Sequence, residues 1–300
     1  MRTVASEILQ SFTSIGFVCL INHGLDHAKV EEMFDWSRRF FDLPLDHKQL
    51  APHPKSGTHH RGYSAPGVER VSQHIYSQEE LENFRKAGQD VKESFEAGRE
   101  DDPLMPNIWL PEDVLPGFKE ACLKFYWDCY ELEIRFLRAL ATGLSLPDTY
   151  FLDFHQIADN QLRLLHYPPV ADEHLSNNTF SRIGAHSDFG TVTVGGLEVQ
   201  DPQDHSRFLP IPVIPGAVIV NAGDFMARWS NDVIKSTVHR VRSPPNQVGE
   251  DGIAPPRYSI PYDLSTIVDA IPGTWDEGNP KKYEPISAKE YVLKRLAALY

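Results

Sequence analysis

The residues best suited to metal binding or catalysis lie around position 186. His186 and Asp188 are separated by one residue beside an apolar run, so in an extended chain their side chains point to the same face. One imidazole and one carboxylate on one face supply two-thirds of the 2-His-1-carboxylate set that holds non-haem Fe(II). The third ligand must come from elsewhere, and His239, within the β-type run Ser236–Val241, is the candidate. We predict that His186, Asp188 and His239 form a metal site with open positions for a co-substrate and O2.

A second pattern, Arg257-Tyr258-Ser259, follows these residues in the sequence. The two-residue step places Arg257 and Ser259 on one face of a strand. An arginine fork pairs with a carboxylate through two parallel hydrogen bonds, and a serine hydroxyl beside it adds a third. Tyr167 would supply a further hydroxyl. These residues predict an anchor for the distal carboxylate of 2-oxoglutarate.

Each part of this pattern has an ordinary structural explanation when taken alone. An isolated His-x-Asp pair is more often a structural hydrogen bond, and His239 alone would suit a protein core. The joint pattern favours a metal site because its parts follow in order within β-type sequence. The remaining histidines of the Pro- and Asp-rich loops are expected to be solvated: His53, His59, His60 and His205.

The elements that must hold these residues change in character along the chain. In the first half, apolar residues at three- and four-residue spacing predict helices over Val4–Phe12, Asp26–Phe41 and Phe118–Leu140. Gly16 ends the first helix, Asp26 is a suitable N-cap for the second, and Phe17–Ile21 predicts a buried strand. Residues 51–67, rich in His, Pro, Gly and Ser, predict a loop.

Beyond about residue 160, short apolar runs alternate with Pro, Gly and Asn. This texture predicts a barrel or sandwich of short strands rather than βαβ units. The expected strands are Leu162–Tyr167, Thr191–Val194, Leu197–Val199, Ala217–Val220, Ser236–Val241 and Tyr258–Ile260. A helix is expected again over Ser287–Tyr300.

Composition narrows the classes of partner. The net charge of -13 argues against nucleic acid, because a phosphate backbone requires a basic face. The sequence contains no apolar run long enough for a membrane span and no signal-peptide pattern at its start. Three scattered cysteines do not form a disulfide framework. We expect a cytoplasmic protein with a small-molecule substrate, and the sequence leaves its oligomeric state open.

On these motifs, and on Gly16-Phe17-Val18, Asn22-His23-Gly24-Leu25 and Arg61-Gly62-Tyr63, the chain resembles the 2-oxoglutarate/Fe(II)-dependent dioxygenase superfamily. The resemblance is to the isopenicillin N synthase-like branch, and within it to fungal thymine 7-hydroxylases. It implies an α+β fold with a double-stranded β-helix (jelly roll) core and a helical N-terminal region. Residues 1–150 would form the helical region, with the first family strand missing, and residues 151–300 the jelly-roll core with a C-terminal helix.

The resemblance also implies an activity. A small organic molecule, either a secondary metabolite or a nucleobase-like heterocycle, would be hydroxylated or otherwise oxidised, with release of succinate and CO2. Fe(II) would be the metal, 2-oxoglutarate and O2 the co-substrates, and ascorbate a stimulant. Arg163 and Phe189 would contact the substrate. The chain departs from the thymine 7-hydroxylase pattern at Phe189, where the family has tyrosine, and it is shorter than the pattern after Val194 and after Tyr262. Thymine is therefore expected to be a poor substrate.

Three other functions fit some of these residues. One is an oxidase of the isopenicillin N synthase type, which uses no 2-oxoglutarate, and another is an inactive relative that retains a metal or metabolite site. A zinc hydrolase also uses two His and one Asp, but it leaves Arg257 and Ser259 without a role. Release of CO2 from labelled 2-oxoglutarate separates the first of these from the dioxygenase.

Overall fold

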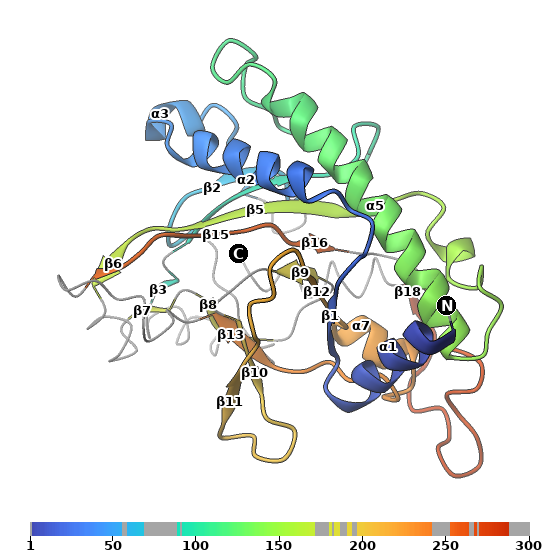
Figure 1. The fold of residues 1–300 in the computed structure, drawn as a ribbon. Coiled ribbons are helices and arrows are strands. Elements are labelled where there is room, and N and C mark those ends of the chain that lie inside the picture. Colours follow the sequence, from blue (N-terminus) through green and yellow to red (C-terminus); the bar gives the residue numbers. More distant parts are fainter. Residues whose placement is uncertain are drawn as a thin grey trace.

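The computed structural model describes residues 2–55, 59–68, 89–90, 92–171, 180–181, 183–186, 191–193, 197–241, 253–263, 267–268 and 270–287. A layer of helices lies across antiparallel sheets (Figure 1). The helices are α1 (Arg2–Ser14), α2 (His27–Phe41), α3 (Leu45–Lys48), α5 (Phe118–Gly143), η1 (Leu152–Phe154) and α7 (Asp224–Trp229). Within the described ranges, every helix is too short or too polar to traverse a bilayer.

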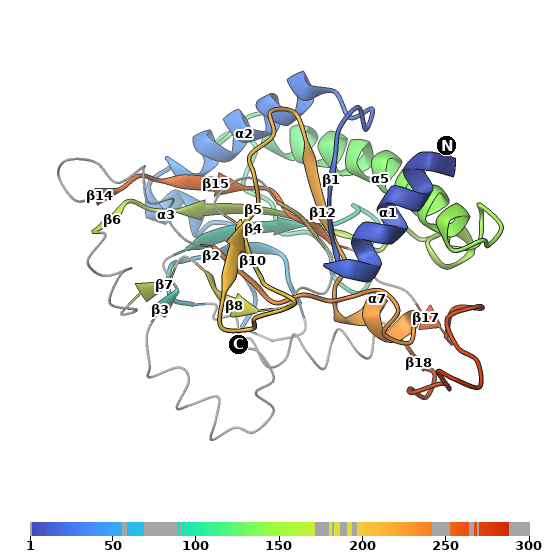
Figure 2. The same ribbon diagram turned by 60° about the horizontal axis from the view of Figure 1, so that its bottom comes forward.

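The largest sheet is built around β5 (Gln161–Tyr167). Its order is β15 (Arg257–Ser259), β5, β4 (Glu93–Ala97) and β2 (Gly62–Ser64), and β16 (Tyr262–Asp263) also pairs with β5. A second sheet has the order β11 (Phe208–Pro210), β10 (Leu197–Gln200), β13 (His239–Val241) and β8 (Ile183–His186). A third has the order β1 (Phe17–Leu20), β12 (Val218–Asn221) and β9 (Thr191–Thr193), and Figure 2 shows β1 beside β12.

Two-stranded pairs complete the described part of the fold. They are β3 (Gln89–Asp90) with β7 (Phe180–Ser181), β6 (Val170–Ala171) with β14 (Ile253–Ala254), and β17 (Ile267–Val268) with β18 (Ile286–Ser287). The first of these pairs is parallel, and the other two are antiparallel. Mixed helices and antiparallel sheets confirm the α+β class.

The core of the described residues contains three apolar clusters, two of which lie on opposite faces of the largest sheet. The first lies between α2, α5 and the large sheet, where the rings of Phe40, Phe95 and Phe118 stand 4.8–5.1 Å apart. The second joins α1, α5 and α7. The third lies on the other face of β5, where Leu165 and Tyr167 meet residues of β10, β12 and β13. Alternation along β5 therefore turns one face toward the helices and the other toward a group of strands that includes β13, which carries the predicted ligand His239.

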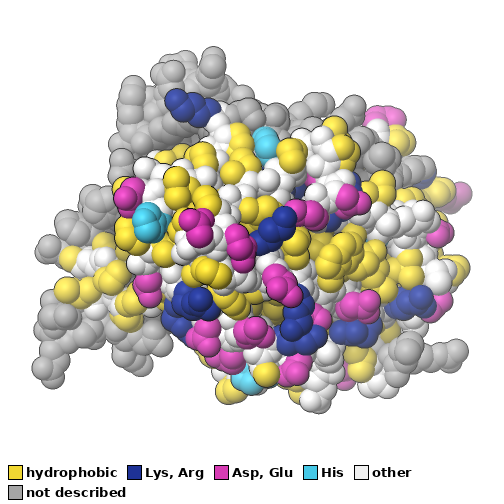
Figure 3. Space-filling view, turned by 90° about the horizontal axis from the view of Figure 1, so that it is seen from above, with side chains coloured by type: hydrophobic (Ala, Val, Ile, Leu, Met, Phe, Trp, Pro, Cys, Tyr) yellow, Lys and Arg dark blue, Asp and Glu magenta, His cyan; other side chains and the backbone are white. Residues whose placement is uncertain are grey.

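On the surface above the helical layer, acidic and basic side chains lie next to one another (Figure 3). Lys29 bonds Asp128 at 2.6 Å, for example, and joins α2 to α5. Partly exposed surface pairs of this kind contribute about 0–1 kcal/mol each. They contribute little stability compared with the aromatic cluster beneath them.

Several predicted elements are confirmed. Asp26 caps α2, since its Oδ1 accepts the backbone N–H of Ala28 at 2.9 Å. The predicted strand after Gly16 is β1, and the long amphipathic helix is α5. The predicted loop 51–67 is wrong in part, because its end forms β2 and pairs with β4, a strand that the sequence pattern did not predict. Of the predicted C-terminal helix, Ser287 ends β18, and residues 288–300 lie outside the described residues.

Candidate metal and co-substrate site

His186 and His239 lie side by side on paired strands. His186 ends β8, His239 begins β13, and the antiparallel register sets the two residues opposite each other. Their ring centroids are 4.3 Å apart at an interplanar angle of 52°. Both side chains are buried. His239 Nδ1 lies 3.2 Å from the carbonyl oxygen of Thr237, and donation to that oxygen leaves Nε2 as the nitrogen with a lone pair for a metal.

The N-terminal segment helps to position His239. Phe17 of β1 packs edge-on against the His239 ring, with centroids 5.4 Å apart. In the segment that leads into β13, Thr237 Oγ1 donates to the carbonyl oxygen of Ile15 at 2.6 Å. The backbone N–H of Lys235 donates to the carbonyl oxygen of Phe12. The turn between α1 and β1 is thus bonded to the residues just before the histidine.

The third predicted ligand, Asp188, and the predicted substrate contact Phe189 lie outside the described residues. The structure therefore brings together two of the three predicted metal ligands. In the sequence, Asp188 lies two positions beyond His186, which is the last residue of β8.

Arg257, Ser259 and Tyr167 come together on β15 and β5. The register pairs Arg257 with Tyr167 and Ser259 with Leu165. The Arg257 guanidinium carbon lies 5.0 Å from the centre of the Tyr167 ring. Ser259 is fully buried, and its Oγ has no hydrogen-bond partner among the described residues. Burial lowers the pKa of Arg257, against the opposing effect of Tyr167. A desolvated guanidinium beside an unmatched hydroxyl suits a ligand carboxylate.

Arg163 is held by an acid that the sequence pattern did not single out. Its Nε donates to Oε1 of the fully buried Glu96 at 2.8 Å, and the two residues are paired across β4 and β5. Arg163 lies on the same alternating face of β5 as Leu165 and Tyr167. This face is the one turned toward β10, β12 and β13.

Two histidines that we expected to be solvated are buried against the same acid. His53 Nε2 lies 3.7 Å and His60 Nδ1 lies 3.9 Å from Glu96 Oε2, and both side chains are only 3% exposed. The expectation of solvated side chains is wrong for His53 and His60 because the pairing of β2 with β4 folds this segment over the sheet. His205, in contrast, is exposed.

His53, His60 and Glu96 also have the composition of a metal site, with candidate ligand atoms all within 4.8 Å of one another. The Arg163 guanidinium already bonds the other carboxylate oxygen of Glu96. A permanent positive charge at that distance disfavours a divalent cation. The cluster is better suited to orienting Arg163 than to holding a metal.

A second acid on β4, Glu93, anchors the opposite face of the sheet. Its carboxylate accepts hydrogen bonds from Lys48 Nζ at 2.8 Å, the Tyr63 hydroxyl at 2.6 Å and His166 Nδ1 at 2.7 Å. Burial alone would raise the pKa of Glu93, but these hydrogen bonds outweigh it and hold the pKa below its ordinary value. The only signal in the sequence was the three-residue spacing of the two acids, which places Glu93 and Glu96 on opposite faces once Glu93–Ala97 is recognised as a strand.

Comparison with known proteins decides the family. Residues 1–112 match the model of the non-haem dioxygenase in morphine synthesis N-terminal family, and residues 158–266 match the 2OG-Fe(II) oxygenase superfamily. The whole chain aligns with 2-oxoglutarate-dependent dioxygenase gloF of Glarea lozoyensis at 36% identity, covering 94% of that protein. The chain belongs to the 2OG-Fe(II) oxygenase superfamily.

Other members of the superfamily refine this placement. Proline hydroxylase buaE of Petromyces alliaceus is 39% identical over 98% of the chain and 92% of its own length. The crystal structure of full-length Neurospora crassa thymine 7-hydroxylase, in complex with alpha-KG and thymine, is 42% identical with a TM-score of 0.87, over 100% of the chain and 92% of that structure. The resemblance to fungal thymine 7-hydroxylases is thus confirmed, and the protein is a 2-oxoglutarate-dependent dioxygenase of an iron-dependent family.

Proposed function

We propose that the protein is an Fe(II)- and 2-oxoglutarate-dependent oxygenase that hydroxylates or otherwise oxidises a C–H bond of a small organic molecule. The observation that carries the proposal is the pairing of His186 with His239 across β8 and β13, with their rings 4.3 Å apart. Asp188, two residues beyond His186, would complete the 2-His-1-carboxylate set. When bound, Fe(II) with 2-oxoglutarate and O2 supplies the oxidation, with succinate and CO2 as co-products.

The chain's own residues would position the co-substrate. Arg257 and Ser259 would bind the distal carboxylate of 2-oxoglutarate, with Tyr167 beside them on the paired strand. Support comes from the fully buried Ser259 hydroxyl and from the desolvated surroundings of Arg257. The same residues disfavour a zinc hydrolase, which has no use for a carboxylate anchor of this kind. We expect ascorbate to stimulate turnover by keeping the metal reduced.

The finer architecture that we propose is a jelly roll within residues 151–300, preceded by a helical region over residues 1–150. Its support is the set of short antiparallel strands that includes β8, β10, β12 and β13. The N-terminal region is not purely helical, because β1, β2 and β4 add to sheets whose other strands come from the C-terminal half. Residue 150 would therefore mark a boundary in the sequence, but the regions on either side of it would not fold independently.

For the substrate, we propose a secondary metabolite or heterocycle with one polar group that Arg163 binds, and Phe189 as a further contact. The relatives include a proline hydroxylase and a structure that contains thymine, which supports a small ring compound as the substrate. Thymine itself should be poor, since Phe189 replaces the tyrosine of the family pattern and the chain is short after Tyr262. An unmatched buried polar group on the substrate costs about 1–3 kcal/mol.

The proposal is tested with purified protein, Fe(II) and 2-oxoglutarate labelled at C1. Release of labelled CO2 is expected even without a substrate, and it should increase with the correct one. His239→Ala should lose bound iron and CO2 release together. Substrate oxidation without CO2 release would show the oxidase alternative, and iron binding without O2 consumption would show the inactive one.

A further inference from the structure

The strand that carries the proposed 2-oxoglutarate anchor has a second face, which is turned toward the helices. Arg257 and Ser259 project from one side of β15, and Tyr258 between them projects from the other. Tyr258 packs on the first core cluster, which includes residues of α2 and α5. Among the described strands, β15 stands at the end of the largest sheet and pairs with β5 over three residues. Because this ladder is short, the orientation of β15 depends on what packs against Tyr258.

Tyr258 is stacked on His166, the residue opposite it in β5. The register pairs these two residues, and their rings lie 4.7 Å apart at an interplanar angle of 18°. Phe41, the last residue of α2, packs near both, with its ring centroid 5.4 Å from that of His166 and 6.4 Å from that of Tyr258. Ring pairs across two strands stabilise the pairing of those strands. The stack therefore holds β15 against β5 from the helical side.

The orientation of the His166 ring is set in turn by Glu93. The two residues are opposite each other on β5 and β4, and His166 Nδ1 donates to Glu93 Oε1 at 2.7 Å. The other carboxylate oxygen accepts hydrogen bonds from Lys48 Nζ at 2.8 Å and from the Tyr63 hydroxyl at 2.6 Å. Lys48 also donates to the carbonyl oxygen of Phe41 at 3.0 Å. A buried carboxylate with both oxygens bonded has a fixed orientation, and so does the ring that it holds.

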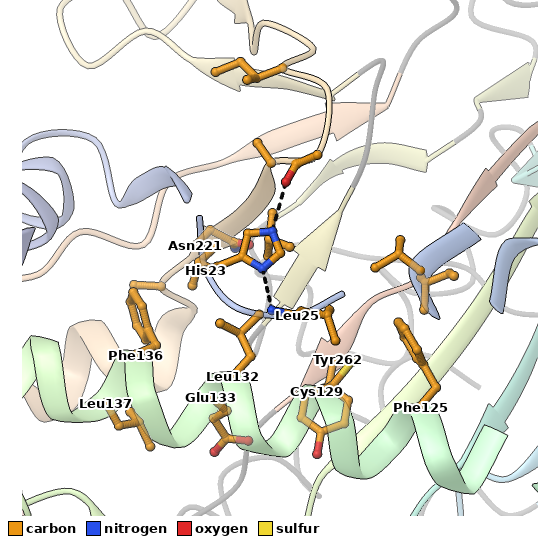
Figure 4. Close-up of a pocket in the computed structure, with 18 of the residues that line it drawn as sticks. His23, Leu25, Phe125, Cys129, Leu132, Glu133, Phe136, Leu137, Asn221 and Tyr262 are labelled. Atoms are coloured by element: carbon orange, nitrogen blue, oxygen red, sulfur yellow. Dashed lines mark hydrogen bonds between the residues drawn. The ribbon is translucent and has the colours of Figure 1, made fainter. Parts of the chain in front are cut away.

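The residues that follow β15 continue the same alternation. Ile260 and Tyr262 belong to the first core cluster, as does the partly buried Tyr258. Tyr262 packs edge-on against Tyr126 of α5, with ring centroids 5.3 Å apart. Ile260 and Tyr262 also line a cavity of about 460 Å³ between α5 and β12, which Figure 4 shows, whereas Tyr258 does not. A change at Tyr258 therefore tests the support of β15 without altering the walls of that cavity.

We propose that Tyr258 and His166 are positioning residues for 2-oxoglutarate. Acting through β15, they hold Arg257 and Ser259 in the geometry that one distal carboxylate requires. This inference rests on the proposed assignment of Arg257 and Ser259 to that carboxylate. A bidentate guanidinium pair depends on direction, so a small rotation of β15 weakens binding although every ligand-binding group remains. Tyr258 and His166 do not touch the co-substrate themselves, because they lie on the opposite face of the sheet from Arg257.

The test is an equilibrium titration of the Fe(II)-loaded protein with 2-oxoglutarate in the absence of O2, followed by the visible absorbance of the complex. Tyr258→Leu should weaken binding about fivefold or more, whereas Tyr258→Phe keeps the stacked ring and should stay within about twofold. His166→Gln keeps a hydrogen-bond donor for Glu93 but lacks the ring, and should weaken binding about threefold or more. Phe118→Leu is the control, because Phe118 belongs to the same cluster but has no ring contact with Tyr258 or His166 among the described residues. It should bind within about twofold of the native protein.

A second ligand, 2-oxopentanoate, separates positioning from a general loss of order. It has the chain length and the 2-oxo acid group of 2-oxoglutarate, but a methyl group replaces the distal carboxylate. Tyr258→Leu should therefore change the binding of 2-oxopentanoate by less than about twofold, whereas disorder around the iron would weaken both ligands alike. In the Arg257→Gln background, Tyr258→Leu should weaken 2-oxoglutarate binding less than it does in the native protein, because residues that act through one another are not additive.

The outcomes separate this inference from the proposed function. If Arg257→Gln weakens 2-oxoglutarate binding and Tyr258→Leu does not, the anchor stands and the positioning role is overturned. Equal weakening of both oxo acids by Tyr258→Leu, or full additivity with Arg257→Gln, would also overturn it. If Arg257→Gln has no effect, the proposed anchor fails and the positioning role fails with it. Circular dichroism checks that each variant is folded, and His166→Gln takes the same comparisons if Tyr258→Leu does not fold.

Discussion

At the scale of single residues, Ser259 links burial to ligand binding. A buried hydroxyl without a partner costs about 1–3 kcal/mol, and Ser259 is fully buried with no partner for its Oγ among the described residues. Its strand also carries Arg257, whose guanidinium is desolvated. Both costs are offset if one carboxylate bonds the two side chains. Because one carboxylate could bond both side chains, we assign Ser259 and Arg257 to the same co-substrate.

Arg257→Gln should therefore raise the 2-oxoglutarate concentration for half-maximal CO2 release by about tenfold or more, because it removes a charge-assisted pair. Tyr167→Phe keeps the ring and removes only a hydroxyl, so its effect should stay below about threefold. Both are measured by titrating 2-oxoglutarate at fixed Fe(II). Equal effects of the two variants would contradict the assigned roles.

Glu96 and Arg163 should be energetically coupled. The Glu96 carboxylate is completely buried and Arg163 is 17% exposed, so removing either partner leaves a desolvated charge. Glu96→Gln and Arg163→Met should each lower the free energy of unfolding by about 3 kcal/mol. The double variant should lose less than the sum, with a coupling of about 1–3 kcal/mol. Urea denaturation of the four proteins measures this cycle, and strict additivity would rule the coupling out.

At the scale of elements, the connection from α1 to β1 depends on Gly16. Its φ is +73°, and a Cβ there would lie 2.0 Å from the carbonyl oxygen of Lys235, in the segment that leads to His239. Gly216 has a similar φ of +71°, but a Cβ there would meet nothing within 4 Å. Substituting each glycine in turn therefore distinguishes the cost of a left-handed backbone from the additional cost of a steric clash.

Gly216→Ala should cost only the left-handed backbone penalty, about 1–2 kcal/mol. Gly16→Ala should cost about 3 kcal/mol or more, because the Lys235 backbone must also move. It should also weaken iron binding, since that movement reaches His239. Thermal denaturation and iron content measure both effects. Similar losses of stability in the two variants would show that the close approach to Lys235 is unimportant.

Which parts of the fold and site the sequence could predict depends on whether an element is determined by local residues or by distant ones. The cap at Asp26, the helix α5 and a strand containing His239 were predictable, because capping, helical periodicity and strand texture are local. The pairing of His239 with His186 was not, since it joins distant parts of the chain. β4 was not, since it mixes charged, polar and apolar residues without strict alternation, and all of them are buried. Its acids become interpretable only when β2 and β5 pair with it from distant parts of the chain.

At the scale of the whole molecule, the helical layer and the strand layer meet at α5. Its inner stripe contributes to both apolar clusters and carries Glu133 between them. Glu133 was predictable as helical but not as buried, because the residue that bonds its carboxyl, Asn160, comes from another part of the chain. Burial at this junction raises the pKa of Glu133, so the stability of the protein should depend on pH.

Glu133→Gln should stabilise the protein increasingly as pH rises from 5 to 8. The folded pKa of Glu133 is raised by burial to about 8 from an ordinary value of 4.5, so the native state holds a proton that the unfolded state has lost in this window. Rising pH then removes stability from the native protein, whereas glutamine does not titrate and keeps the hydrogen bond from Asn160. Urea denaturation at a series of pH values should give a difference that widens up to about pH 8 and then levels off. Glu131→Gln, an exposed change on the same helix, is the control and should give no such trend. A difference for Glu133→Gln that stays constant between pH 5 and 8 would show that Glu133 is ionised in the folded protein.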